Sequence, residues 1–206
     1  MTVDLTSKAT FDFVNVLSQA AAAYLGHRGT RPSPEILVNA LVQAEKSAKQ
    51  QRLSDPFESL VGKWQLCFAT GTKKVRERGG IVLGKGFYVP NFIRIHVSFN
   101  ATFEQDSDRG EINNQVELGP VLLKLTGPVQ YLSKKNLLAF DFNQMLISLF
   151  DRVVYNRPMR SGKVQTEDFY NQTIAQLPFF AFFLVTEDFI AARGRGGGLA
   201  FWIRES

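Results

Sequence analysis

Val61-Gly62-Lys63-Trp64-Gln65-Leu66-Cys67-Phe68-Ala69-Thr70 is the stretch that decides the fold. Trp64, Leu66 and Phe68 alternate with Lys63, Gln65 and Cys67, which is the period of a strand that buries one face. Gly62 stands directly before the tryptophan, where a residue without a side chain lets the chain turn or a large ring pass. The sequence before this stretch is typical of helices, and most of the sequence after it is typical of strands and turns.

Two helices are expected before this strand, over residues 7–25 and 33–54. Ser7 and Ser33 are the expected N-caps, and Pro34 suits a first helical position. Each helix carries one apolar stripe, which favours packing against the β region: Phe13, Val16, Leu17 and Ala20 in the first, and Leu37, Leu41, Ala44 and Ala48 in the second. We therefore expect residues 1–58 to form a helical region that packs on a β domain of residues 59–206.

Residues 91–104 show the cleanest strand alternation, with one apolar and one polar face, which indicates antiparallel sheet. Further strands are expected at 111–118, in two short segments separated by Gly119-Pro120 and Gly127-Pro128, and at 136–142, 178–185, 190–193 and 199–204. Residues 178–185 are apolar on both faces, so another layer must cover them. Residues 151–176 are polar and irregular, typical of a lid or a flexible insertion. Eight or more short strands indicate a barrel or a sandwich. Seven residues are predicted to face its interior and to bind any ligand: Trp64, Leu66, Phe68, Ile93, Ile95, Val97 and Phe99.

The composition is that of a globular protein with an excess of one aromatic residue. Of 206 residues, 45% are hydrophobic and 18 are Phe, which favours apolar burial over hydrogen-bonded recognition. The net charge of +5 lies entirely after residue 61, so the β domain is moderately basic. That balance suits an anionic membrane surface, anionic lipid or nucleic acid, and equally suits simple solubility. If the basic domain docks on anionic lipid, binding is expected to weaken steeply as salt rises.

The location of the protein is constrained weakly. Cys67 is the only cysteine, which excludes an intramolecular disulfide and favours a reducing compartment. The first residues lack the features of a secretory signal or a transit peptide, and the longest apolar run, 177–185, is too short for a spanning helix. We expect a soluble or peripheral protein of a bacterium, or a processed organellar form.

Residues with catalytic or metal-binding chemistry show no pattern that points to a site. His27 and His96 are not followed by further ligands at metal spacing, and Cys67 is expected to act as a small hydrophobic residue. Glu167-Asp168 and Glu187-Asp188 are sequence neighbours, which point to opposite faces in a strand and so form no acid–base pair. We expect no catalytic residues, no metal and no cofactor.

Three segments resemble one family. The Gly62–Leu66 opening, the Asn100–Phe103 strand end and above all Thr186–Gly197 (TEDFIAARGRGG) look like the plastid-lipid-associated proteins, the fibrillins of plants and cyanobacteria. The similarity covers roughly residues 8–206, and the closing motif is its most specific part. It implies a lipocalin-like barrel at plastoglobules or thylakoid membranes, which binds small apolar molecules such as prenylquinones, carotenoids or fatty acids.

The closing motif matches the family pattern only in part. Asp188, Arg193, Gly194 and Gly196 match it, whereas Ile190 stands where an Arg is usual and Arg195 where an Asp is usual, so a role for an acid at that tip is in doubt. Asp188 and Arg193 are expected to form an ion pair. Lipocalin-type barrels often stack an arginine of the closing strand over the Gly-x-Trp ring, which here predicts Arg204 over Trp64.

Three classes of function remain, in this order. The first is a binding module that holds an apolar ligand of the prenylquinone, carotenoid or fatty acid type at thylakoid or plastoglobule-like membranes. The second is a structural coat of lipid bodies with a filled barrel. The third is a lipocalin-shaped enzyme, such as an isomerase or a pigment lyase. The expected partners are an apolar ligand or lipid and an anionic membrane, with no nucleic acid, and the oligomeric state stays open.

Overall fold

The computed structural model describes residues 5–27, 29–75, 80–101, 108–159 and 169–205. Two helices and a short 3-10 turn come first: α1 (Leu5–Tyr24), α2 (Pro34–Gln51) and η1 (Phe57–Leu60). The elements that follow are β1 (Gly62–Ala69), β2 (Thr72–Val75), β3 (Gly80–Leu83), β4 (Phe87–Tyr88), β5 (Ile93–Ala101), β6 (Arg109–Leu118), β7 (Val121–Leu132), η2 (Ser133–Lys135), β8 (Leu137–Phe140), β9 (Gln144–Leu149), β10 (Arg152–Pro158), η3 (Ile174–Gln176), β11 (Phe179–Val185), β12 (Phe189–Gly194) and β13 (Leu199–Arg204).

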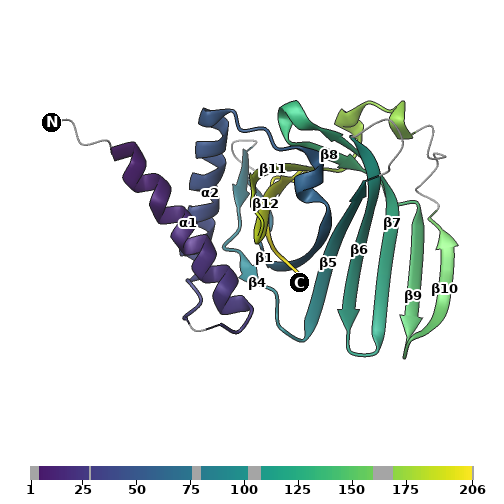
Figure 1. Cartoon of the computed structure of the whole chain (residues 1–206). Helices are drawn as coiled ribbons and strands as arrows, with labels where there is room; N and C mark the ends of the chain where they lie inside the picture. Colours follow the sequence, from purple (N-terminus) through teal and green to yellow (C-terminus); the bar gives the residue numbers. More distant parts are fainter. Residues whose placement is uncertain (1–4, 28, 76–79, 102–107, 160–168, 206) are drawn as a thin grey trace.

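Eight of these strands close into an antiparallel, lipocalin-like barrel. Their order is β1, β5, β6, β7, β8, β11, β12 and β13, and β13 pairs with β1 to complete the circle. Closure satisfies the backbone groups that the edges of an open sheet leave unpaired. The expected α+β class, with a helical pair before a barrel, is confirmed (Figure 1).

Strand β7 has two successive partners along one edge, and this change of partner shapes the molecule. Its first half, Val121–Thr126, pairs with β9, and its second half, Val129–Leu132, pairs with β8. The hairpin of β9 and β10 therefore extends the β5–β6–β7 sheet away from the closed barrel (Figure 1). The prediction that Gly127-Pro128 separates two short strands was wrong, because β7 runs through both residues.

The two helices cover the outside of the barrel on the side opposite β9 and β10 (Figure 1). Their predicted apolar stripes pack on outward-facing residues of the closing strands in one buried cluster, which includes Leu17, Leu41, Phe183 and Phe201. This layer explains why residues 178–185 are apolar on both faces. Ser33 caps α2 as predicted, since its hydroxyl accepts a hydrogen bond from the Ile36 amide. Ser7 does not cap α1, because that helix begins at Leu5.

A bulge in β1 changes the face of Phe68. Leu66 lies opposite Trp202 and Phe68 lies opposite Phe201, so Cys67 is an extra residue between the two pairs. Trp64 and Leu66 belong to the interior, whereas Phe68 and Cys67 pack under the helices. The prediction that Phe68 faces the barrel interior was wrong, because period-2 alternation holds only where no bulge intervenes.

The segment predicted as a long loop, 151–176, contains regular structure. Residues Arg152–Pro158 form β10, and Ile174–Gln176 form η3. Residues 160–168 of that segment, with Glu167 and Asp168, lie outside the described residues. So do residues 102–104 of the predicted strand 91–104, which is seen as Ile93–Ala101.

Candidate functional site

The inner face of the barrel continues without a break onto the β9–β10 extension. Trp64 lies opposite Val97, Val97 opposite Asn114, and Asn114 opposite Leu125. The same row goes on through Met145 to Arg157 at the outer edge. Directly opposed residues of neighbouring strands share a face, so this row runs from the barrel core to the end of the extension.

The next two rows of the inner face are apolar. One row joins Ile95, Val116, Leu123, Ile147 and Tyr155, and the row at the strand ends joins Ile93, Leu118, Val121 and Leu149. None of these side chains is fully buried. We call the following half-buried set the open half of the barrel: Ile95, Val116, Leu123, Leu125, Met145 and Ile147.

The other half of the barrel is filled with aromatic rings. The Phe99 and Phe182 rings meet edge to face with centroids 6.0 Å apart, and Phe180 meets Trp202 in the same way at 5.4 Å. Strand residues such as Trp64, Ile112 and Val129 complete a buried core with Leu60 of η1. These buried, mutually contacting side chains make this half a continuous apolar core.

A polar cluster closes the end of the filled half. The buried Asn136 side chain accepts hydrogen bonds from the Asp55 amide at 2.9 Å and the Tyr131 hydroxyl at 3.2 Å, and it donates to the Leu53 carbonyl at 3.1 Å. Burial raises the pKa of Asp55 and of Tyr131 above their ordinary values. Since its side chains already have partners within the fold, this cluster joins the α2–η1 linker to β7 and β8.

An open hollow of about 800 Å³ adjoins the open half at its outer edge. Met145, Tyr155, Arg157, Pro158 and Met159 line it. The first three lie on the same inner face as Leu125 and Ile147. The site therefore combines a long apolar wall with a phenol and a guanidinium at one end, which suits a molecule with an apolar body and a polar end.

Arg204 covers Trp64 as predicted. The guanidinium carbon lies 4.0 Å from the centre of the Trp64 ring, and its Nη1 donates to the Val61 carbonyl at 3.3 Å. Trp64 is itself fixed, because its indole N–H donates to the Leu60 carbonyl at 2.8 Å. A Cβ on Gly62 would lie 2.7 Å from the Arg204 Nη1 atom, and Gly62 has φ +130°, so both space and backbone require glycine.

Arg193 pairs with Glu45 of α2 and not with Asp188. Its Nε donates to Glu45 Oε1 at 2.8 Å, and its Nη2 donates to the second carboxylate oxygen, a bidentate pair. The predicted Asp188–Arg193 ion pair was wrong. The exposed Asp188 lies beside a groove of about 280 Å³ between α1 and the last strands, and its backbone carbonyl accepts from the Arg204 amide. The closing motif thus ties the barrel to its helices through Arg193.

Other residues with reactive side chains lie away from the open half. His96 is buried on the outer face of β5, with its Nε2 3.5 Å from a carboxylate oxygen of Glu205, and burial lowers its pKa. Cys67 is buried under the helices, where burial raises the pKa of its thiol to about 12. Within the described residues, no group of three or more His, Cys, Asp or Glu is placed to hold a metal ion.

Of the seven predicted interior residues, the structure brings six together on the inner face and places Phe68 elsewhere. Trp64, Val97 and Phe99 are buried in the filled half, and Leu66 packs against that core. Of the seven, Ile95 alone belongs to the open half, and Ile93 lies in the next row of the same face. Leu123, Leu125, Met145 and Ile147 were missed, because 121–125 and 145–149 are apolar runs without clean alternation. Phe150-Asp151 forms the turn that follows 145–149, and this pair is not a typical turn signal in a sequence.

Comparison with known proteins adds little to this geometry. No family model matches the chain, and a search of the curated proteins finds no match. Among solved structures, the chain is similar to a redesigned β-barrel at 10% identity and a TM-score of 0.33, over 75% of this chain and 98% of that one. Neither α1, α2 nor another helix in the described part of the chain is long and apolar enough to cross a membrane.

Proposed function

We propose that the protein binds a small, largely apolar molecule in the open half of the barrel and carries it. The observation that supports this is the row of half-buried apolar side chains on the inner face, of which Val116, Leu123 and Ile147 are central. Apolar surface left in contact with water costs about 25 cal/mol per Å², so an apolar occupant stabilises this half. This half borders the filled core, because Ile95 lies two residues before the buried Val97 on β5.

The polar groups at the edge of the site favour a ligand with one polar end. Asn114 lies on the inner face within the apolar rows, and Tyr155 and Arg157 lie at the hollow. A quinone carbonyl or a carboxylate accepts hydrogen bonds from such groups. The resemblance to the plastid-lipid-associated proteins points to the same ligands: prenylquinones, carotenoids or fatty acids, at thylakoid or plastoglobule-like membranes.

We propose binding without catalysis. Asp55 and Tyr131, two groups whose pKa burial shifts, lie at the closed end, where Asn136 and backbone groups engage them. In an active site, titratable groups with shifted pKa values are expected to face a pocket. These two serve the joint between the linker and the barrel.

A structural coat of lipid bodies is the second candidate. The observation in its favour is the filled half of the barrel, where Phe99, Phe182 and Trp202 occupy the centre. A coat protein needs a stable barrel and an apolar surface, but no ligand. The two candidates differ in whether the purified full-length chain takes up an apolar probe in solution.

The test is a titration with cis-parinaric acid, a fluorescent fatty acid, against the full chain and two matched variants. Ile147 faces the open half, and its neighbour Leu146 lies on the outer face of the same strand and is also half-buried. Ile147→Asn places an unpaired amide in the site and is expected to weaken probe binding about tenfold or more. Leu146→Asn is expected to change it less than about twofold. Absence of binding to the unmodified chain, or equal losses in both variants, would contradict the proposal and favour the coat.

A further inference from the structure

One end of the β5–β6–β7–β9 sheet carries a band of apolar side chains that are exposed, except for the half-buried Ile93. Ile93, Leu118, Val121 and Leu149 lie in one cross-strand row at the strand ends. Phe92 precedes β5 and is 71% exposed, and Phe150 follows β9 and is 72% exposed. We call these six residues the rim. The rim borders the open half of the barrel, because its row is the last row of the same inner face.

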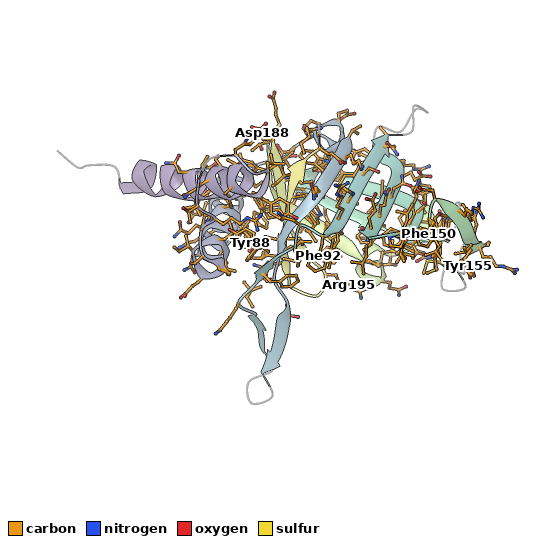
Figure 2. The ribbon with its side chains drawn as sticks, turned by 90° about the horizontal axis from the view of Figure 1, so that it is seen from below. Tyr88, Phe92, Phe150, Tyr155, Asp188 and Arg195 are labelled. Atoms are coloured by element: carbon orange, nitrogen blue, oxygen red, sulfur yellow. The ribbon has the colours of Figure 1, made fainter. Side chains whose placement is uncertain are left out.

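The two turns of the rim are tied together. The Phe150 amide donates to the Pro120 carbonyl at 2.9 Å, which links the β9–β10 turn to the β6–β7 turn. Seen from this end, Phe92 lies toward the side of β4, and Phe150 lies near Tyr155 at the side of β10 (Figure 2). The rim is therefore a coherent edge and not a set of isolated exposed residues.

Phe150 has a backbone conformation that a bulky residue rarely adopts. Phe150 and Asp151 form the two-residue β9–β10 turn with φ of +48° and +60°. Asn-Gly is the favoured pair in such a turn, and a bulky residue at positive φ is an outlier. The ring gains no compensating burial, since 72% of Phe150 is exposed. Strain kept at an exposed aromatic residue points to a contact outside the chain.

The charges around the rim are few and nearly balanced. The four residues of its row are uncharged. Arg94, Glu117, Asp151 and Arg152 adjoin the rim along the chain, two basic and two acidic, and Arg31 donates to the Asn91 side chain next to Phe92. An uncharged row flanked by charges of both signs suits the boundary between the acyl chains and the headgroups of a lipid surface. Aromatic and aliphatic tips reach the acyl boundary while guanidinium groups meet phosphates.

We propose that the rim docks on a lipid surface, with Phe92 and Phe150 inserted at its interface and the open half of the barrel facing the apolar phase. This rests on the proposed function, because the orientation lets an apolar ligand pass from lipid to the barrel without crossing water. A protein partner fits the rim less well. The row spans four strands, about 15 Å, and is one side chain deep, whereas a stable protein interface buries about 800 Å² on each side.

The test is flotation of the full chain with vesicles of neutral phosphatidylcholine, and with vesicles that also contain phosphatidylglycerol. The double variant Phe92→Ser/Phe150→Ser is expected to lower the partition coefficient about tenfold on both. Leu53→Ser is the matched control, since Leu53 is 52% exposed and its carbonyl bonds Asn136 beyond the far end of β7. It is expected to float like the unmodified chain. Equal flotation of the double variant and the unmodified chain would overturn the proposal.

Two further readouts separate this inference from the proposed function. Phe92→Ser/Phe150→Ser is expected to bind cis-parinaric acid in solution within about twofold of the unmodified chain, and Ile147→Asn to float normally. A Trp at the rim, Phe150→Trp, is expected to be quenched by brominated phosphatidylcholine, and Leu53→Trp not to be. The inference would be overturned if the unmodified chain did not float and light scattering showed a dimer that the double variant loses. The rim would then bind a second copy of the chain and not lipid. Probe binding tests the ligand site separately.

Discussion

Removal of the Arg204 side chain tests how the barrel closes. Arg204→Ala deletes the cation–π contact with Trp64 at 4.0 Å and the hydrogen bonds to the Val61 and Glu187 carbonyls. The stacking contributes about 0.5–2 kcal/mol, and hydrogen bonds from a charged donor about 1.5–3 kcal/mol when buried. Arg204 is half-buried, so we expect a total loss of about 2–3 kcal/mol in the free energy of unfolding.

The assay is equilibrium unfolding in urea followed by far-UV circular dichroism, which reports mainly on the backbone. With a slope of about 2 kcal/mol per molar urea, the midpoint is expected to fall by about 1 M at an unchanged slope. The affinity for cis-parinaric acid at moderate temperature is expected to stay within about twofold, because Arg204 lies outside the open half. A loss in stability below about 0.5 kcal/mol would refute the reasoning that this pair holds the barrel closed.

A second substitution in the same place isolates the geometry. Gly62→Ala places a side chain at a positive φ, which lowers the stability of the fold in any background. The contact of the new Cβ with Arg204 Nη1, at 2.7 Å, exists only when Arg204 is present. The cost of Gly62→Ala is therefore expected to be about 1 kcal/mol smaller in the Arg204→Ala background. Equal costs in both backgrounds would show that the backbone alone demands glycine.

The remaining predictions concern two other joints. Glu45→Gln is expected to cost about 1–3 kcal/mol above about pH 5, because it breaks the bidentate pair with Arg193. The hydrogen bond from Arg193 lowers the pKa of Glu45 in the folded state, so the pair stabilises the fold above the ordinary Glu pKa and that stability is lost as pH falls through the lowered pKa. Urea midpoints of both proteins across pH 2–7 should therefore converge on the acid side, and a constant gap would contradict the pairing. Asn136→Ala is expected to cost about 2–4 kcal/mol, and Asn136→Gly about 0.5–1 kcal/mol less than that, because φ is +47° there; identical losses would exclude backbone strain as a contributor.

The alternation of the long strand and the motif at the two barrel ends were predictable from the sequence. Ile93, Ile95 and Val97 share the inner face because a two-residue period survives wherever a strand is regular. The contact of Arg204 with Trp64 was predicted from the strand face on which Arg204 lies and from the pairing of the first and last strands in a closed barrel. Neither argument needs information on contacts.

Features that depend on an extra residue or on a distant partner were not predictable in the same way. The bulge after Leu66 shifts Phe68 to the helix side, and no signal in VGKWQLCFAT marks it. Arg193 was assigned to Asp188, five residues away, although its partner Glu45 lies 148 residues earlier. Sequence proximity favours the wrong acid here, because β12 turns Arg193 toward α2 and leaves Asp188 at an exposed turn.

The change of partner along β7 explains why the barrel has one filled and one open half. At Gly127 a Cβ would lie 1.9 Å from the Asp141 carbonyl oxygen, so only glycine lets the segment between β8 and β9 run this close beside β7. Pro128 follows and has no N–H to donate, which suits a position where β7 changes partner from β9 to β8. After Gly127-Pro128, β8 and β11 close the barrel, and aromatic rings fill it. Before Gly127-Pro128, β9 carries the sheet outward, no strand among the described residues closes over the inner face of β7, and Leu123 and Leu125 stay half-buried. The change of partner at Gly127-Pro128 therefore determines both the stability of one half and the capacity of the other to hold an apolar ligand.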